Sequence, residues 1–169
     1  MRRRLMTLLF AVAATTTPWL SLPVRAATPL AVTGGDPIAV GEYLVTIGGC
    51  NDCHTVGWNQ APGAVPPAQR LTGSPIGWHG PWGTSYAINL RLLMQQLSEE
   101  QWLHYVATMQ PKPPMPWYNM RAMSEADLKA MYAYIHSLGP AGAPMPVDLP
   151  PGRLPTAPYI EAPPQAPKP

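Results

Sequence analysis

Apolar residues recur at helical spacing in three segments of the chain, 36–48, 98–109 and 124–138. Each segment opens on an aspartate or serine suited to cap a helix N-terminus, and glycine follows the first and the third. The apolar positions are, in chain order, Val40, Tyr43, Leu44, Ile47, Trp102, Tyr105, Val106, Met109, Leu128, Met131, Tyr132, Ile135 and Leu138. The pattern predicts three or four short helices.

The segments between these helices have no regular period. Residues 55–97 are rich in glycine, proline and tryptophan, and the four prolines of 111–116 exclude a helix and predict an extended segment. Because no segment shows a convincing strand pattern, we predict an all-α fold without strands. The helical stripes supply too little apolar area for a domain of roughly a hundred residues, so something besides side chains must fill its interior.

Proline dominates the C-terminal end, where it accounts for 11 of the 31 residues from Gly139 to Pro169. This composition predicts an extended, polyproline-like tail over 140–169 with no core of its own. Such a tail is either a disordered end or a segment that docks on another protein. The single domain is expected over 27–139.

The N-terminal segment resembles a targeting sequence rather than part of the fold. Three arginines at 2–4 precede a mostly apolar run over 5–14, and Val24-Arg25-Ala26 places small residues at a signal-peptidase site. We expect residues 1–26 to be a signal peptide, cleaved after Ala26, and the mature chain to be exported and soluble, with no membrane span. An uncleaved anchor is the weaker alternative, because the apolar run stops well short of the about 20 residues that a span needs.

The leader also explains the basic charge of the chain. Of 11 basic residues four lie in the leader, which leaves seven basic and nine acidic residues and a net charge of about −2. The isoelectric point of 8.6 is therefore no sign of nucleic-acid binding, and we expect no nucleic-acid partner.

The two cysteines of the chain lie in one run, Cys50-Asn51-Asp52-Cys53-His54, which has the C-x-x-C-H spacing of haem attachment. Two thiols three positions apart can add to the two vinyl groups of one porphyrin, and His54 is then presented to the iron. One covalent haem c would also fill the interior that the helices leave. A thioredoxin-like redox pair of cysteines is expected in a βαβ unit, and the sequence shows no strand pattern. A zinc site would need four ligands, and the chain has no second cysteine pair. A structural disulfide between the two cysteines would leave the adjacent His54 unexplained.

A second axial ligand should come from a rigid loop downstream. Met115 lies between prolines in Pro113-Pro114-Met115-Pro116-Trp117, and a methionine ligand raises the reduction potential relative to a second histidine. His79 is the strongest rival, because its loop could also reach the haem. The other candidates are Met109, Met120, Met123, His104 and His136, which we expect to pack in the core, fill gaps or face solvent.

The chain resembles the class I monohaem c-type cytochromes of the bacterial periplasm from about residue 36 to 138. The matching residues are Gly41-Glu42-Tyr43-Leu44, the C-x-x-C-H motif, Met115-Pro116-Trp117 and the run from Asp127 to Ile135. The resemblance implies a small all-α fold whose first and last helices cross near Gly41 and Tyr132. It also implies a periplasmic location, His54/Met115 ligation and single-electron transfer. Similar domains serve as subunits of quinoprotein or flavoprotein dehydrogenases.

Several further residues are candidates for tuning the haem environment. Trp82 or Tyr86 could hydrogen-bond a haem propionate, Arg91 could pair with one, and Trp117 could shield the distal side of the iron. The alternative is ordinary packing, with Arg91 in solvent. Trp78 and Asn89 lie in the same irregular segment.

Two axial ligands leave no open position on the iron, so the sequence favours an electron carrier over an enzyme. We expect redox proteins as partners, with the donor and acceptor unspecified. One alternative is a haem enzyme or gas sensor with an open sixth position. Another is a haem-bearing subunit that docks on a periplasmic dehydrogenase through the tail.

Overall fold

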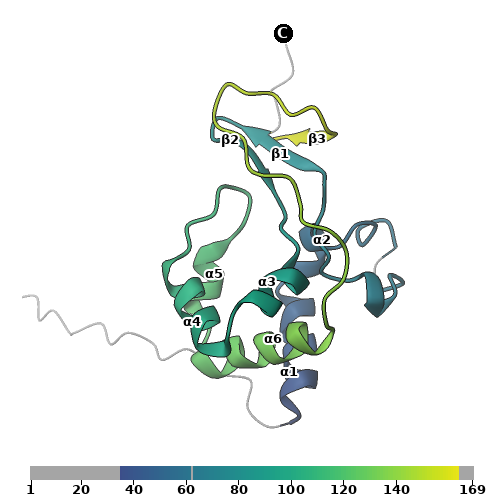
Figure 1. Cartoon of the computed structure of the whole chain (residues 1–169), viewed down its shortest axis with the longest axis vertical. Helices are drawn as coiled ribbons and strands as arrows, with labels where there is room; N and C mark the ends of the chain where they lie inside the picture. The colour runs from purple at the N-terminus through teal and green to yellow at the C-terminus, as the bar shows by residue number, and fades with distance from the viewer. Residues whose placement is uncertain (1–34, 62, 164–169) are drawn as a thin grey trace, which may run out of the picture.

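The computed structural model describes residues 35–61 and 63–163 (Figure 1). The predicted signal peptide, residues 1–26, lies outside this part of the chain. Within it, the helices are α1 (Pro37–Ile47), α2 (Cys50–His54), the 3-10 helix η1 (Pro67–Gln69), α3 (Leu90–Gln96), α4 (Glu99–Thr108), α5 (Trp117–Ala122) and α6 (Glu125–Ser137). The strands are β1 (Gly77–Gly80), β2 (Gly83–Tyr86) and β3 (Tyr159–Glu161).

The three predicted helices are confirmed as α1, α4 and α6, and each has the expected N-cap. The Asp36 side chain accepts a hydrogen bond from the Ile38 amide, and the Ser124 side chain accepts one from Asp127. Ser98 and Gln101 form a complete capping box at α4. These bonds satisfy amide groups that a helix N-terminus otherwise leaves without partners.

Helices α1 and α6 cross closely, as predicted, with Gly41 at the crossing. A Cβ atom on Gly41 would lie 2.0 Å from the carbonyl oxygen of Ala130 and 2.6 Å from the Cβ of Tyr134. These two residues flank Tyr132 on α6, so the crossing lies near Gly41 and Tyr132, as predicted, although the side chain of Tyr132 itself contacts Leu97 and His136. Only a residue without a side chain lets the two backbones approach to this distance.

The hydrophobic core lies between α1, α3, α4 and α6. Its most buried members are Val45, Leu71, Met94, Val106, Met131 and Ile135. Trp102 is also buried, and its indole Nε1 donates to Leu128 O at 2.9 Å, which joins α4 to α6. A buried indole N–H normally needs such an acceptor.

The prediction that the fold lacks strands is wrong, although the fold is mainly helical. Strands β1 and β2 form an antiparallel hairpin, and β3 pairs with β1 in parallel, so the sheet order is β2-β1-β3. Figure 1 shows this small sheet at the opposite end of the molecule from α6. Gly83, in the turn, has φ +94°, a conformation that favours glycine.

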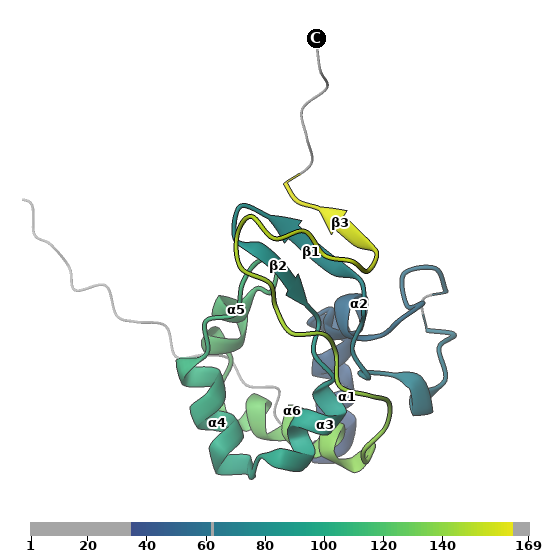
Figure 2. The same cartoon turned by 45° about the horizontal axis from the view of Figure 1, so that its top comes forward.

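The proline-rich segment 140–163 is extended, as predicted, but it is packed against the domain rather than disordered. Figures 1 and 2 show it running from the end of α6 back to the sheet. Leu149 pairs with Thr84 of β2 in an isolated antiparallel bridge, and the segment ends in β3. We call residues 140–163 the strap.

Among the described residues, no helix has both the length and the apolar character needed to cross a bilayer.

Candidate haem-binding site

The C-x-x-C-H motif forms one short helix, α2, directly after α1. Gly49 precedes it in the left-handed conformation, with φ +66°, and this turns the chain from one helix into the next. Cys50 and Cys53 are three positions apart on this helix, which places both on one face. Neither cysteine forms a disulfide. The motif therefore presents two free thiols side by side.

Both thiols are neutral at physiological pH. Burial raises the pKa of Cys50 to about 11, with a smaller contribution from the nearby Asp52, and burial also raises the pKa of Cys53. Within residues 35–61 and 63–163, no three His, Cys, Asp or Glu side chains are grouped to hold a metal ion.

His54 is buried and held in one orientation. Its side chain is 7% exposed, and its Nδ1 lies 2.7 Å from the carbonyl oxygen of Ile88. Burial lowers the pKa of the imidazole, although the bond to Ile88 opposes this shift, so the ring is neutral. A carbonyl oxygen can only accept, so Nδ1 carries the proton and Nε2 keeps its lone pair. The structure leaves one metal-binding nitrogen on a fixed ring.

The backbone around His54 is also fixed by buried hydrogen bonds. Gly73 N donates to His54 O at 2.8 Å. Thr55 Oγ1 donates to Asn51 Oδ1 at 2.7 Å and accepts from Leu71 N at 2.8 Å. These bonds attach α2 to residues 71–73 and limit the movement of the imidazole.

Met115 lies in the loop between α4 and α5 and is half-buried against the core. The Ser85 hydroxyl of β2 donates to Pro113 O at 2.5 Å, and Trp117 N donates to Met115 O at 2.9 Å. Ser85 thus anchors the loop of Met115, while Ile88, three residues later, anchors His54. One short segment, 85–88, therefore positions both predicted ligands.

The model of the Cytochrome c family matches residues 38–139 of the chain. The chain belongs to the cytochrome c family. No curated protein and no solved structure matches it significantly. Membership implies a covalently bound haem, and Cys50 and Cys53 have the spacing that attachment requires.

Trp82 provides a test of whether this cytochrome c can accommodate a haem. Its indole Nε1 is buried and has no hydrogen-bond partner, the only such side-chain group in the described part of the chain. Buried polar groups in native proteins are nearly always paired, so this N–H is expected to meet an acceptor that a ligand supplies. A haem propionate is such an acceptor, and the residues present therefore fit the group.

Arg91 and Tyr86 are both buried in the structure. Arg91 is buried, so the alternative that places it in solvent is wrong, and it donates to three backbone carbonyl oxygens. These are Ala68 O at 2.8 Å, Gly139 O at 2.6 Å and Leu138 O. Tyr86 is buried beside Gly77. The hydrogen bonds of Arg91 to Leu138 O and Gly139 O hold the end of α6 in place. Contacts of Arg91 or Tyr86 with a haem propionate remain predictions.

Trp117 begins α5, two residues after Met115, and is half-buried. The guanidinium of Arg121 lies 4.3 Å from the centre of its ring, and Arg121 also donates to Met109 O at 2.6 Å. This stack fixes the indole next to the Met115 loop. Shielding of the distal side of the iron by Trp117 remains a prediction.

The rival ligand His79 lies in β1. Its Nδ1 is 2.9 Å from Thr84 Oγ1, and its ring packs edge-on against Tyr159 of β3. Residues of β2 and β3 therefore contact the His79 ring on two sides. His104 and His136 are exposed, as predicted.

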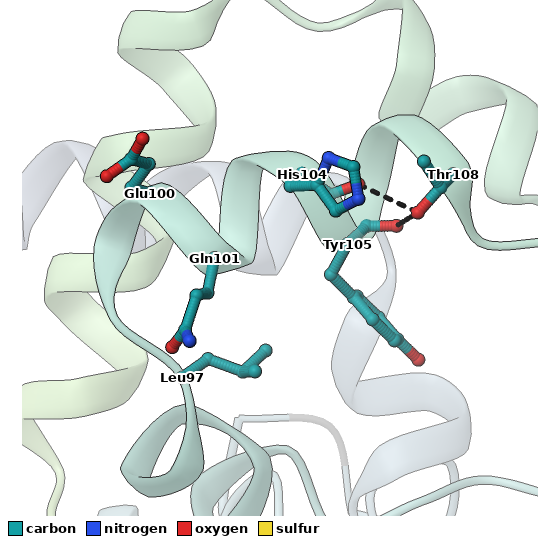
Figure 3. A pocket seen from close by; sticks show the side chains of 6 residues that line it. All are labelled: Leu97, Glu100, Gln101, His104, Tyr105 and Thr108. Atoms are coloured by element: carbon teal, nitrogen blue, oxygen red, sulfur yellow. Dashed lines mark hydrogen bonds between the residues drawn. The ribbon is translucent and has the colours of Figure 1, made fainter.

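An open pocket of about 460 Å³ lies along α4, away from the C-x-x-C-H motif in sequence (Figure 3). Its lining residues are Leu97, Glu100, Gln101, His104, Tyr105 and Thr108. The Thr108 hydroxyl already donates to the carbonyl oxygen of His104 at 2.9 Å. Of these residues only His104 was considered as an axial ligand, and it is exposed on α4. We assign the pocket no function.

Sequence reasoning missed the residues that hold His54 and the Met115 loop in place. Ile88 contributes only a carbonyl oxygen, which every residue has, so no sequence signal marks it. Ser85 and Lys112 act through side chains, but their partners are backbone oxygens distant in sequence.

Proposed function

We propose that this cytochrome c is a periplasmic carrier of single electrons. One haem c is attached through Cys50 and Cys53, and His54 and Met115 are its axial ligands. The observation that carries the proposal is the His54 ring, whose Nδ1 is committed to Ile88 O while Nε2 remains free, directly after two thiols on one face of a helix.

The bound haem supplies a one-electron couple between ferric and ferrous iron. The residues of the chain determine how it is held. Each thiol adds across a vinyl double bond, its hydrogen going to one carbon and its sulfur to the other, so nothing leaves. His54 would hold the iron through Nε2, and Met115 would supply the second ligand through its thioether sulfur. With both axial positions occupied, the iron would have no open position, which favours electron transfer over substrate chemistry.

Export of the protein is part of the proposal. The basic and apolar pattern of residues 1–26 supports a cleaved signal peptide, and covalent attachment prevents loss of the haem outside the cytoplasm. We propose redox proteins as partners, with small and transient interfaces.

The proposal is tested on the exported protein by two measurements. Mass spectrometry after denaturation should show the mature chain plus one haem, and Cys50→Ala with Cys53→Ala should abolish this mass increase. Exposure of the reduced protein to carbon monoxide should leave its optical spectrum nearly unchanged, because Met115 occupies the sixth position. Rapid binding of carbon monoxide would contradict the carrier and favour an enzyme or gas sensor with an open site.

A further inference from the structure

The strap lies beyond the part of the chain that the cytochrome c family model matches, which ends at residue 139. We infer that the strap is a positioning element for the sixth ligand: it clamps the loop that carries Met115 against β2. This inference rests on the Met115 ligation of the proposed function.

The start of the strap is fixed beside the anchor of His54. Asn89, the neighbour of Ile88, donates from Nδ2 to Ala141 O at 2.8 Å and to Ala143 O at 3.2 Å. Its Oδ1 accepts from Leu92 N and caps α3. One buried amide therefore fixes both the strap and the helix that follows the His54 anchor.

The middle of the strap pairs with β2. Thr84 N donates to Leu149 O at 3.1 Å, and Leu149 N donates to Thr84 O at 2.9 Å. Tyr86 N donates to Asp148 Oδ1 at 3.1 Å. The approach is so close that a Cβ atom on Gly83 would lie 2.1 Å from Leu149 O. The strap thus extends the edge of the sheet at the strand that carries Ser85.

Lys112 connects the Met115 loop to this point of the strap. Its Nζ donates to Leu149 O at 2.8 Å and lies 4.0 Å from Asp148 Oδ2. Pro113, the next residue, accepts the hydrogen bond from Ser85. The loop is therefore attached to the strap three residues before Met115 and to β2 two residues before it.

These contacts matter because an axial methionine is held mainly by the loop that presents it. Residues that orient a metal ligand from outside change metal affinity or activity by about 10- to 100-fold when they are mutated. The Lys112–Asp148 ion pair is half-exposed and contributes little by itself, so the hydrogen bond to Leu149 O is the main connection. Loss of that bond frees the loop and lets Met115 leave the iron more often.

The end of the strap is held by the sheet. Strand β3 pairs with β1 from Gly77–Tyr159 to His79–Glu161, and Ala162 N donates to His79 O at 2.8 Å. Because its two ends and its middle are hydrogen-bonded to the domain, the strap holds Leu149 O, the acceptor for Lys112, in a fixed position.

The test compares carbon monoxide binding by the haem-loaded, reduced protein in Lys112→Met, Asp148→Ala and a chain that ends at Gly139. We expect Lys112→Met and the truncated chain to bind carbon monoxide about 10-fold faster than the wild type. We also expect both variants to lose the weak far-red absorbance band of iron-bound methionine at a lower pH than the wild type does. Lys129→Met is the matched control, because it removes the same charge from an exposed lysine on α6 that pairs with Glu99 and Glu125.

Measuring the unfolding temperature together with the carbon monoxide binding rate distinguishes a change in the position of Met115 from a general loss of stability. Lys112→Met keeps the alkyl chain and should leave the thermal unfolding temperature nearly unchanged while the binding rate rises. If Lys112→Met binds carbon monoxide at the wild-type rate, the inference is overturned, whatever Asp148→Ala does and even if the truncated chain fails to fold. Met115→Ala, measured in parallel, tells the two claims apart. If it keeps the far-red band, the proposed ligation fails, and if it loses the band while the strap variants behave as wild type, only the strap inference fails.

Discussion

A buried N–H group without an acceptor costs about 1–3 kcal/mol of stability. The indole of Trp82 is in that position, and no other side-chain nitrogen or oxygen of the described residues is. By contrast, the buried indole of Trp102 has its acceptor in Leu128 O. At the scale of single residues, Trp82 is the place where the polypeptide alone is incomplete, which is what a haem-binding chain should show.

The direction in which Trp82→Phe changes the free energy of unfolding tests this interpretation. If the indole donates to a propionate, the substitution should lower the free energy of unfolding of the loaded protein by about 1.5–3 kcal/mol, the range for a bond to a charged group. Chemical denaturation followed by circular dichroism measures this change. Trp58→Phe is the control, because Trp58 is half-buried and stacks only on Arg70. An unchanged or increased free energy of unfolding would mean that the indole has no partner in the loaded protein.

At the scale of elements, the fold depends on the crossing of α1 and α6. These two helices pack against each other more extensively than any other pair of elements. The contact holds α2 in place, because α2 follows α1 after only two residues. A change at Gly41 therefore acts on the haem motif through packing.

Gly41→Ala should destabilise the protein by about 1–3 kcal/mol or more, because its Cβ meets the backbone oxygen of Ala130, which cannot move independently of α6. Thermal unfolding of the loaded protein measures the loss. Ala39→Ser, at an exposed position of the same helix, should change the unfolding temperature little. Equal unfolding temperatures for Gly41→Ala and Ala39→Ser would show that the crossing is not close.

The sequence predicts α1, α4 and α6 because each combines a capping residue with a stripe of two turns or more. Helices α2, α3 and α5 have five to seven residues, too few for a period to be seen. The strands are three or four residues long, and β3 pairs with β1 across about eighty residues of chain, so no local pattern marks them. The same reasoning holds for the site. Cys50, Cys53 and His54 form a local motif, whereas Ile88 O and Leu149 O act through backbone atoms and distant pairing.

At the scale of the whole molecule, the proposed cleavage after Ala26 would change the net charge of the chain. The full chain has a net charge of +2, whereas the chain from residue 27 has about −2. A small net charge gives little long-range steering, so partner choice should depend on contacts near the haem edge.

Isoelectric focusing of the exported protein tests the cleavage. We expect focusing below pH 7, since seven basic side chains face nine acidic ones and the haem adds two propionates. Mass spectrometry of the same band should show an N-terminus at Ala27. Focusing near 8.6, the value of the full chain, would show that the leader is retained.

Closure of the haem iron by His54 and Met115 is best tested by comparing the wild type with a variant that lacks the methionine. Optical spectra of the oxidised and reduced exported protein are recorded for the wild type and for Met115→Ala. The account predicts that haem stays covalently attached in both, that the far-red band of the oxidised wild type disappears in Met115→Ala, and that only the variant binds carbon monoxide rapidly. A Met115→Ala spectrum identical to that of the wild type would contradict it and would direct attention to His79 as the sixth ligand.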